Sequence, residues 1–283
     1  MMSDHDPTLP NEPVIDLRAV SLAQNFKLAL TDLIQGTLNW RLNFKLGLLD
    51  TKLKYRGSIL GPFWITIIMA SKIGTIGFLY AYLLHISLHD YLPFISLSII
   101  LWIYISGIMN DSCSIFTNAR QLILSTRIPY SVYAWRHIIA HAFIFLHNLV
   151  VIVIVFSIFK IFPKNLYLLP PAAFLWIADS LSICLLLGIL GTRFKDIPPI
   201  VANITQALFF ITPIVWKPSL LSFNNSYILL NPFYPLIEII RGPILGEPLS
   251  SSLWWAAVGY SVVLWILTLL IFSKTRFRIP YWM

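Results

Sequence analysis

Charged residues are scarce in this chain. Asp, Glu, Lys and Arg together make up 11% of its 283 residues, whereas 58% of the residues are hydrophobic. Because a soluble domain carries about 25% charged residues, the charge present here is too sparse to cover a folded body of this size in water. The excess apolar surface must face lipid, so the composition predicts an integral membrane protein.

Motifs for nucleotide binding and for hydrolysis are also missing. The chain has no G-x-x-x-x-G-K-[ST] loop, no H-E-x-x-H pair and no nucleophile elbow. His137 and His141 are four residues apart, but the sequence shows no third ligand, so we predict a structural role for them and no metal site. Cys113 and Cys184 lie in or beside apolar stretches and are expected to be core residues. We expect neither an enzyme nor a resident cofactor in this chain.

Nucleic acid is not expected as a partner, although the formal net charge is +8. The basic residues are not gathered in one patch. They stand mostly beside hydrophobic segments, where Lys and Arg set the orientation of a membrane protein.

Six segments are apolar enough to cross a bilayer, which takes a helix of about 20 residues. They are 61–84, 92–110, 138–159, 166–190, 198–216 and 253–273. Six crossings leave both termini on one side, and that side then holds fifteen of the 20 Lys and Arg residues. This excess predicts that both termini are cytoplasmic. Proline pairs at 170–171 and 198–199 are expected to delay the fourth helix and to begin the fifth.

An amphipathic helix is predicted ahead of the first span. It covers residues 36–58, after a cytoplasmic tail at 1–35 and before a membrane domain at 59–283. Basic residues occupy its other faces, a pattern typical of a helix that lies in the membrane interface or packs on a soluble partner. Its apolar stripe consists of Leu38, Leu42, Leu46, Leu49 and Leu53.

The stretch KYRGSILGPFW (54–64) joins this helix to the first span. Its basic start ends the in-plane helix, Gly57 and Gly61 allow a bend, and Pro62 begins the helix that enters the bilayer.

The loop 217–252 is too long for a simple connector. It contains NPFYPLIEIIRGPILG (231–246), whose length suggests a re-entrant or interfacial helical hairpin. Glu238 and Arg241 are three residues apart on one helix face and are expected to neutralise each other.

Ionisable and aromatic residues within spans are candidates for function. Lys72 either pairs with Asp179 of the fourth span or meets an anionic or hydroxyl-rich substrate. Most aromatic residues fit interfacial belts, but mid-span aromatic faces also suit the apolar faces of sugar rings. The residues predicted to line a substrate channel are Trp64, Lys72, Tyr80, Tyr82, Trp102, Tyr104, Phe209 and Phe210.

Three stretches in this order resemble permease subunits of polysaccharide-exporting type-2 ABC transporters. They are KYRGSILGPFW, RFKDIPPIVANITQALFFITPIVW (193–216) and NPFYPLIEIIRGPILG, followed by one last span and a short basic tail. The resemblance covers residues from about 40 to 283. The family includes O-antigen, capsule and teichoic-acid exporters.

The resemblance implies a homodimer of six-span subunits around a continuous channel, driven by two copies of a separate ABC ATPase that binds ATP and magnesium. It implies a gate at the amphipathic helix, coupling to the ATPase through 114–129 and 191–197, and an exit lined by the late hairpin. The implied gate and lipid-headgroup residues are Lys54, Tyr55, Arg56, Gly57, Gly61 and Pro62. The implied coupling residues are Phe116, Arg120, Leu122, Arg127, Arg193 and Asp196, and the exit residues are Tyr234, Glu238 and Arg241.

The leading hypothesis is a permease of the cytoplasmic (inner) membrane that exports an undecaprenyl-pyrophosphate-linked glycan. A related permease for a drug or a simple lipid is the nearest alternative. A membrane-embedded glycosyltransferase or polymerase is less favoured, because the large loop holds few carboxylates.

Overall fold

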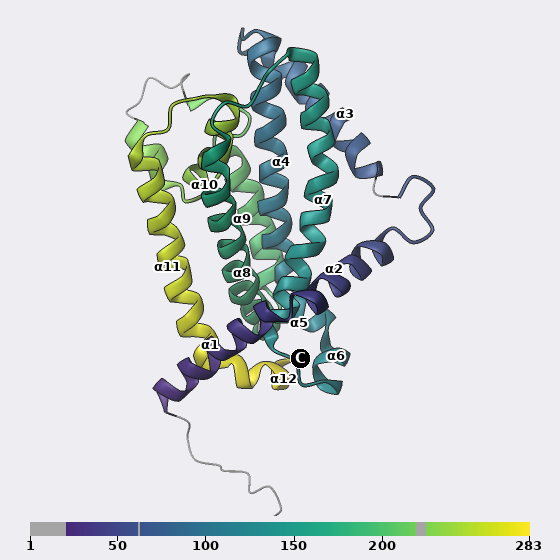
Figure 1. Ribbon diagram of the computed structural model, residues 1–283, viewed down its shortest axis with the longest axis vertical. Helices are drawn as coiled ribbons and strands as arrows, with labels where there is room; N and C mark the ends of the chain where they lie inside the picture. Colours follow the sequence, from purple (N-terminus) through teal and green to yellow (C-terminus); the bar gives the residue numbers. More distant parts are fainter. Residues whose placement is uncertain (1–20, 62, 219–224) are drawn as a thin grey trace, which may run out of the picture.

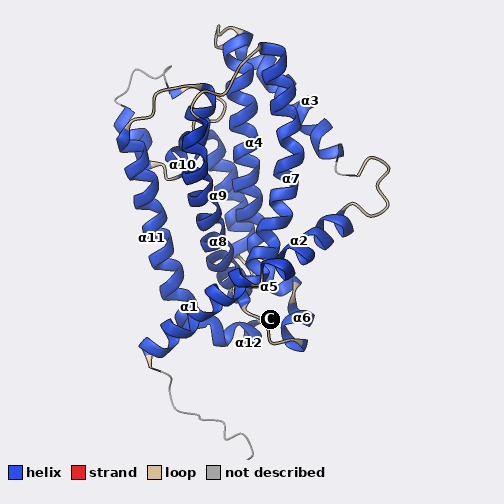
Figure 2. Cartoon of the chain, viewed as in Figure 1, coloured by secondary structure: helices blue, strands red, loops and turns tan. Residues whose placement is uncertain are grey.

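The computed structural model describes residues 21–283 except residue 62 and residues 219–224. Every regular element in this part of the chain is a helix, as Figure 2 shows, which confirms the predicted all-α class. Pro62, predicted to start the first span, lies outside the described residues.

Five helices of the described chain are long and apolar enough to cross a membrane. They stand side by side in Figure 1 and match the first four and the last of the predicted spans. The proline pairs lie in the first turns of the fourth and fifth predicted helices, as expected. The five helices are α3 (Phe63–Leu83), α4 (Leu88–Ser112), α7 (Tyr130–Phe159), α8 (Leu169–Arg193), preceded by the 3-10 turn η1 (Leu166–Leu168), and α11 (Ser251–Thr275).

The fifth predicted span is shorter than expected. Its helix, α9 (Ile197–Ile211), has 15 residues and is therefore about 22 Å long, less than the roughly 30 Å of a hydrocarbon core. The helix ends because Thr212 precedes Pro213, and proline drives the preceding residue out of the helical region. Thr212 accordingly has a ψ of 138°. The sixth crossing stays a prediction.

Two helices cross one end of the bundle. α1 (Leu22–Leu38) and α2 (Trp40–Lys54) run obliquely below the long helices in Figure 1 and are separated at Asn39. The boundary predicted at residue 35 between tail and amphipathic helix therefore falls inside α1. Most of the predicted leucine stripe points away from the bundle, since Leu38, Leu42, Leu49 and Leu53 are exposed.

Glycines allow α1 and α2 to approach α7 closely. A methyl group on Gly36 would lie 1.9 Å from Oγ of Ser131, and one on Gly47 would lie 2.7 Å from Cγ2 of Ile139. Small residues at such crossings let two helix backbones come together. Asn43 is buried at this contact and donates a 2.7 Å hydrogen bond to the carbonyl oxygen of Gly36.

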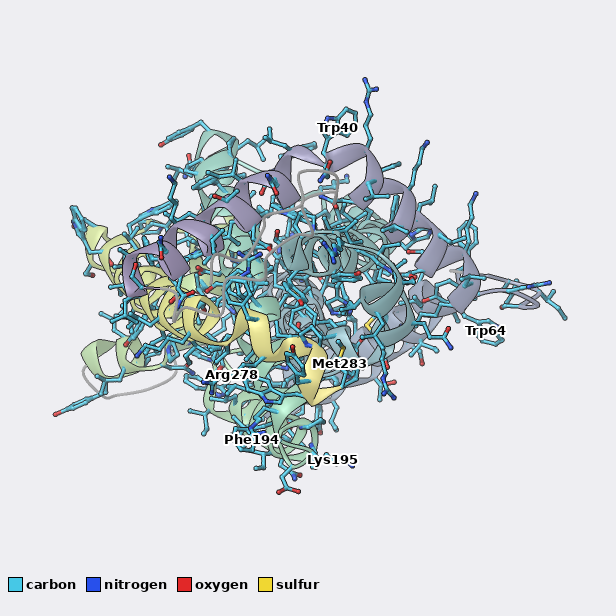
Figure 3. All side chains as sticks on the ribbon, turned by 90° about the horizontal axis from the view of Figure 1, so that it is seen from below. Trp40, Trp64, Phe194, Lys195, Arg278 and Met283 are labelled. Carbon is cyan, nitrogen blue, oxygen red and sulfur yellow. The ribbon has the colours of Figure 1, made fainter. Side chains whose placement is uncertain are left out.

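Short elements gather at the same end of the bundle. They are α5 (Ile115–Asn118), α6 (Arg120–Ser125), the 3-10 turn η4 (Arg276–Arg278) and α12 (Ile279–Trp282). Figure 3 looks onto this end and shows Phe194 and Lys195, which connect α8 to α9, together with the C-terminal Arg278 and Met283. We refer to it below as the α1–α2 end.

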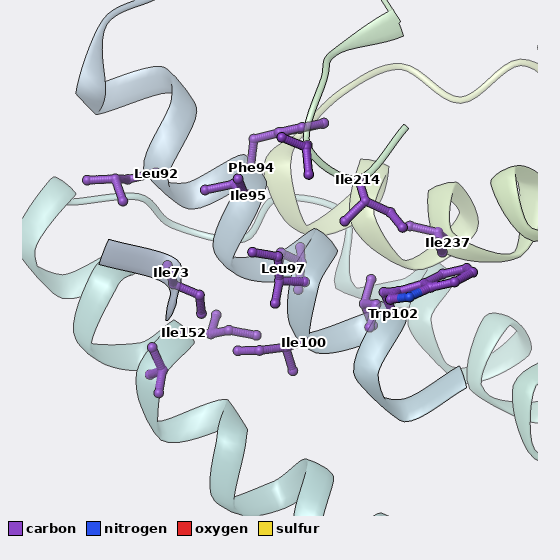
Figure 4. Close-up of a cluster of buried hydrophobic side chains, with 14 of the residues drawn as sticks. Ile73, Leu92, Phe94, Ile95, Leu97, Ile100, Trp102, Ile152, Ile214 and Ile237 are labelled. Carbon is purple, nitrogen blue, oxygen red and sulfur yellow. The ribbon is translucent and has the colours of Figure 1, made fainter. Parts of the chain in front are cut away.

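The core is built around α4, which is apolar on all sides and therefore expected to be buried. Figure 4 shows its side chains packed against residues from α3, α7, the segment after α9, and α10. The α4 residues labelled there are Leu92, Phe94, Ile95, Leu97, Ile100 and Trp102, and their neighbours include Ile73, Ile152, Ile214 and Ile237.

α10 (Phe233–Leu245), preceded by the 3-10 turn η3 (Asn225–Leu230), lies in the half of the bundle away from the α1–α2 end (Figure 1). It packs on α4, α8 and α11. Its 13 residues are too few to span a bilayer. A re-entrant position for this segment stays a prediction.

Candidate transport site

A polar cavity of about 460 Å³ opens between α2, the end of α4, α5 and α7. A second cavity of about 320 Å³ continues along α3, α4 and α7, past Tyr55 and Tyr104. The two cavities are adjacent, because four residues line both: Lys54, Asp111, His141 and Ile144. We refer to the two cavities together as the Lys54 path.

The charged groups of this path differ in how they are paired. Arg136 donates from Nε and Nη2 to both carboxylate oxygens of Asp50. Nε2 of His141 lies 3.1 Å from Oδ2 of Asp111. Lys54 forms no ion pair with any described residue. Its ammonium group is therefore available to an anionic ligand at the junction of the two cavities.

Residues 55–61 carry the chain from α2 to α3. Gly57 and Gly61 have φ angles of 83° and 54°, a left-handed conformation that glycine adopts readily, which confirms the predicted bend. Arg56 is exposed beside them. Tyr55 is half-buried, and burial raises the pKa of its phenol. The hydroxyl group therefore stays protonated at neutral pH and is able to donate a hydrogen bond.

Four of the predicted channel residues come together between α3, α4 and α9. The ring centroid of Phe209 lies 6.3 Å from that of Trp102 and 5.2 Å from that of Phe210. Nζ of Lys72 lies 6.0 Å from the centre of the Phe209 ring. Trp102 is buried, whereas Lys72 and Phe210 are exposed. This group, which we call the Lys72 cluster, thus opens onto the outside of the single chain.

The other four predicted channel residues lie elsewhere. Tyr104 lines the second cavity and stacks on Trp176, with ring centroids 5.5 Å apart. Trp64 and Tyr82 are exposed near opposite ends of α3, and Tyr80 packs at the edge of the core. The structure of a single chain does not bring the eight predicted residues into one lining.

Lys72 and Asp179 do not form the ion pair that one hypothesis placed between the first and fourth spans. Asp179 is buried and accepts a 2.7 Å hydrogen bond from Oγ of Ser261 on α11. Lys72 instead lies over Phe209 of α9. The hypothesis was wrong because α4 packs against both α3 and α8.

The segment 114–129, through which the resemblance implies coupling to the ATPase, contains the two short helices α5 and α6. Phe116 is fully buried, with its ring 5.8 Å from that of Tyr130. It therefore anchors the segment and offers no surface to a partner. Leu122 is partly buried against the core, and Arg120 and Arg127 are exposed.

The segment 191–197 reaches the same end. The guanidinium carbon of Arg193 lies 5.1 Å from the centre of the Trp282 ring of α12, and Asp196 is exposed. Apolar side chains that the sequence interpretation did not select, Phe194 and Tyr281, are also exposed there. The exposed residues at the α1–α2 end therefore include basic and aromatic groups and the carboxylate of Asp196.

The predicted pairing of Glu238 with Arg241 is confirmed, but the pair is buried. Nε of Arg241 donates to Oε2 of Glu238 over 3.1 Å, and Nη1 donates to Oγ of Ser98 and to the carbonyl oxygen of Pro213 over 2.8 and 2.7 Å. The guanidinium also lies 4.3 Å from the centre of the Phe94 ring. Arg241 thereby attaches α10 to α4 and to the segment that follows α9. Tyr234, the third predicted exit residue, is half-buried.

Two groups of polar residues at the α1–α2 end were not predicted as sites. Asp111, His137 and His141 come together in the lining of the first cavity. Asp32 is buried where α1 meets α7 and the C-terminal segment. The sequence signals for the first group were the i, i+4 spacing of the histidines and the place of Asp111 as an ionisable residue at the end of a predicted span. Nothing in the sequence pointed to the second group.

No family model matches the chain. Among curated relatives, the O-antigen export system permease protein RfbA of Myxococcus xanthus is 20% identical over 192 residues, which cover 68% of this chain and 74% of the relative. Two proteins of the same name from Klebsiella pneumoniae are 21% and 22% identical over 232 and 236 residues, covering 81% of this chain and 90% of each relative. These matches confirm the resemblance to O-antigen export permeases. Together with the five long apolar helices, they show a multi-pass membrane protein.

Proposed function

We propose that this chain is the membrane subunit of an ABC exporter that moves a lipid-linked glycan out of the cytoplasm. Relatives named as O-antigen export permeases support the class of transporter. The observation that carries the proposal in this chain is a set of polar side chains exposed at mid-depth on the outside of the bundle.

These side chains lie on α3 and α9. Lys72 is near the middle of α3 and exposed, and Asn203 and Gln206 are exposed near the middle of α9. A lysine facing hydrocarbon at the centre of a bilayer costs about 2.5–3.5 kcal/mol. Asn203 and Gln206, three residues apart, share one face of their helix. A water-filled path enclosed by this face and a second copy of the chain removes the cost, so we propose a homodimer with α3 and α9 at the channel.

The two cavities lined by Lys54 are the proposed entry for the end of the glycan that is attached to its lipid carrier. The ammonium group of Lys54, which has no ion-pair partner among the described residues, suits the oxygens of a pyrophosphate together with the nearby Arg56 and the phenol of Tyr55. The aromatic rings of the Lys72 cluster suit a glycan, because stacking on sugar rings is weak and repeats along a polymer. An undecaprenyl-pyrophosphate-linked glycan carries both parts.

The driving force is proposed to come from a separate ABC ATPase, since the sequence has no phosphate-binding loop of its own. The mixed basic and aromatic surface at the α1–α2 end is the proposed contact, with Arg120 and Arg127 at its centre. This assignment makes that end cytoplasmic, in agreement with the excess of Lys and Arg there.

Replacing Lys72 by Met tests the proposal. In cells that lack the native chain, Lys72→Met is expected to restore export roughly tenfold less well than the native sequence, an effect of about 1.4 kcal/mol on a barrier. Surface glycan should fall and glycan attached to its lipid carrier should accumulate inside. Lys160→Met, at an exposed position just after α7, is the matched control and should restore export fully. Full export by Lys72→Met contradicts a channel at this face.

A further inference from the structure

Three potential metal ligands converge where α4 ends beside α7. Asp111 lies in the last turn of α4, and His137 and His141 lie one turn apart on the same face of α7. Each residue offers one ligand atom, and the three atoms all lie within 4.8 Å of one another. The cluster forms part of the wall of the 460 Å³ cavity, so an ion from solution has a route to it.

The surrounding contacts hold two of the donors and leave the third without a partner. Gly107 makes room for the His141 ring, because a methyl group there would lie 2.7 Å from Cε1 of the imidazole. His141 in turn places Nε2 3.1 Å from Oδ2 of Asp111. Nε2 of His137 is buried and has no hydrogen-bond partner among the described residues. A buried nitrogen without a partner is costly, and a ligand in the cavity would satisfy it.

We propose that Asp111, His137 and His141 form a binding site for a divalent transition-metal ion, with Zn²⁺ as the ion best suited to it. Two imidazole nitrogens and one carboxylate oxygen are a ligand set that zinc takes, with a fourth position left for water or for an anion in the cavity. The proposal of a metal site here does not depend on which cargo the transporter carries.

The geometry fits zinc after a small movement. Tetrahedral zinc with bonds of about 2.0–2.2 Å holds its ligand atoms roughly 3.3 Å apart. The 3.1 Å separation of His141 and Asp111 already matches this value. The most distant donor has to move by at most about 1.5 Å, which is within the reach of a side-chain rotation.

The charges around the cluster select the kind of ion. Lys54 lines the same cavity, and its positive charge repels a metal ion there. The charge of Arg136 is neutralised by Asp50. Of the described carboxylates that line the cavity, Asp50 is paired with Arg136, which leaves Asp111 to supply negative charge to the ion. Mg²⁺ and Ca²⁺ depend on several oxygen ligands, so they are not expected to bind. Zn²⁺ gains affinity from the imidazole nitrogens and tolerates this environment.

Zinc binding to the full-length chain in nanodiscs tests the proposal, with the protein purified through a tag that contains no histidine. The probe is Zn²⁺ alone, measured by calorimetry, and Co²⁺ serves as a second probe through its visible absorption. One zinc ion per chain is expected, and an excess of Mg²⁺ should not compete. Asp111→Asn, His137→Gln and His141→Gln should each weaken zinc binding by about 100-fold or more, beyond the 10- to 100-fold expected for a residue that only orients a ligand by a hydrogen bond.

His147→Gln is the matched control. His147 lies on the same helix, and its Nδ1 is paired with the carbonyl oxygen of Phe143. This variant should bind zinc as the native chain does. His137→Gln removes no hydrogen bond between Nε2 and a described residue, so the variant is expected to fold, which size-exclusion chromatography will show. The proposal is overturned if the native chain binds no zinc, or if His137→Gln folds and still binds zinc with native affinity and cobalt with the native spectrum.

Discussion

Replacing Asp32 by Ala is expected to release α1 from the bundle. The carboxylate is buried and accepts hydrogen bonds from the backbone N–H groups of Tyr130 and Ser131 over 3.1 and 3.0 Å, and from Oγ of Ser131 over 2.8 Å. Nη2 of Arg276 donates over 3.1 Å to Oδ2, the oxygen that also accepts from the N–H group of Tyr130. Pro129, the residue before α7, gives no side-chain cap, so Asp32 supplies the cap from a distant helix.

The free-energy cost of Asp32→Ala follows from the groups that lose their partner. Without the carboxylate, two N–H groups at the start of α7 lose their acceptor and Arg276 becomes an unpaired charge. Removing one partner of a buried ion pair costs about 3–5 kcal/mol, which corresponds to a roughly 150- to 5,000-fold increase in the population with α1 detached. Asp32→Asn keeps an acceptor for α7 but loses the charge, so its effect should be intermediate.

Hydrogen exchange followed by mass spectrometry on the chain in nanodiscs is the assay. In Asp32→Ala, the peptide that contains Tyr130 and Ser131 should lose roughly two or more orders of magnitude of protection. Asp196→Asn, which changes an exposed carboxylate at the same end, should exchange as the native chain does. If Asp32→Ala keeps native protection at this peptide, the carboxylate does not hold α1 in place.

The remaining predictions concern α10 and the proposed dimer. Arg241→Met should destabilise the chain by about 3–5 kcal/mol because it leaves Glu238 buried without its partner, and thermal unfolding in nanodiscs should show a lower Tm; an unchanged Tm would refute the structural role of this pair. Gln206→Cys should crosslink two copies in native membranes, because α9 is proposed to face the partner, whereas Val262→Cys, exposed on α11, should not. Equal crosslinking at both positions would reject the proposed interface.

Local sequence features predicted well where several helices begin and where the chain bends between them. The bend at Gly57 and Gly61 and the helix starts at the proline pairs follow from backbone restrictions that act within a few residues. The pairing of Glu238 with Arg241 follows from their spacing on one helix. Each of these features depends on neighbours in the chain, and each is present in the structure.

Features that depend on distant contacts were not predictable in the same way. The approach of α1 to α7 depends on Gly36, but the position of a glycine in a helical pattern does not indicate which helix packs against it. Lys72 and Asp179 were paired because both are ionisable and lie within spans, but the order of the helices around α4 keeps them apart. The third potential metal ligand, Asp111, comes from a different helix than the histidines, so spacing along the chain did not reveal it.

The length of α9 was overestimated for a local reason. The apolar pattern continues through 198–216, but Pro213 ends the helix at Ile211. Hydropathy alone reports which residues tolerate lipid and not whether the backbone stays helical.

The location of lipid-linked glycan in cells without this chain is the most direct test of its proposed export function. Membranes from the deletion strain are converted to sealed vesicles of each orientation, and the glycan is probed with an enzyme that cannot cross the bilayer. Glycan on its lipid carrier is expected to accumulate on the cytoplasmic face, and the native chain, supplied again, should restore glycan to the cell surface. Normal surface glycan in the deletion strain, with none retained on the cytoplasmic face, would show that this chain does not export it.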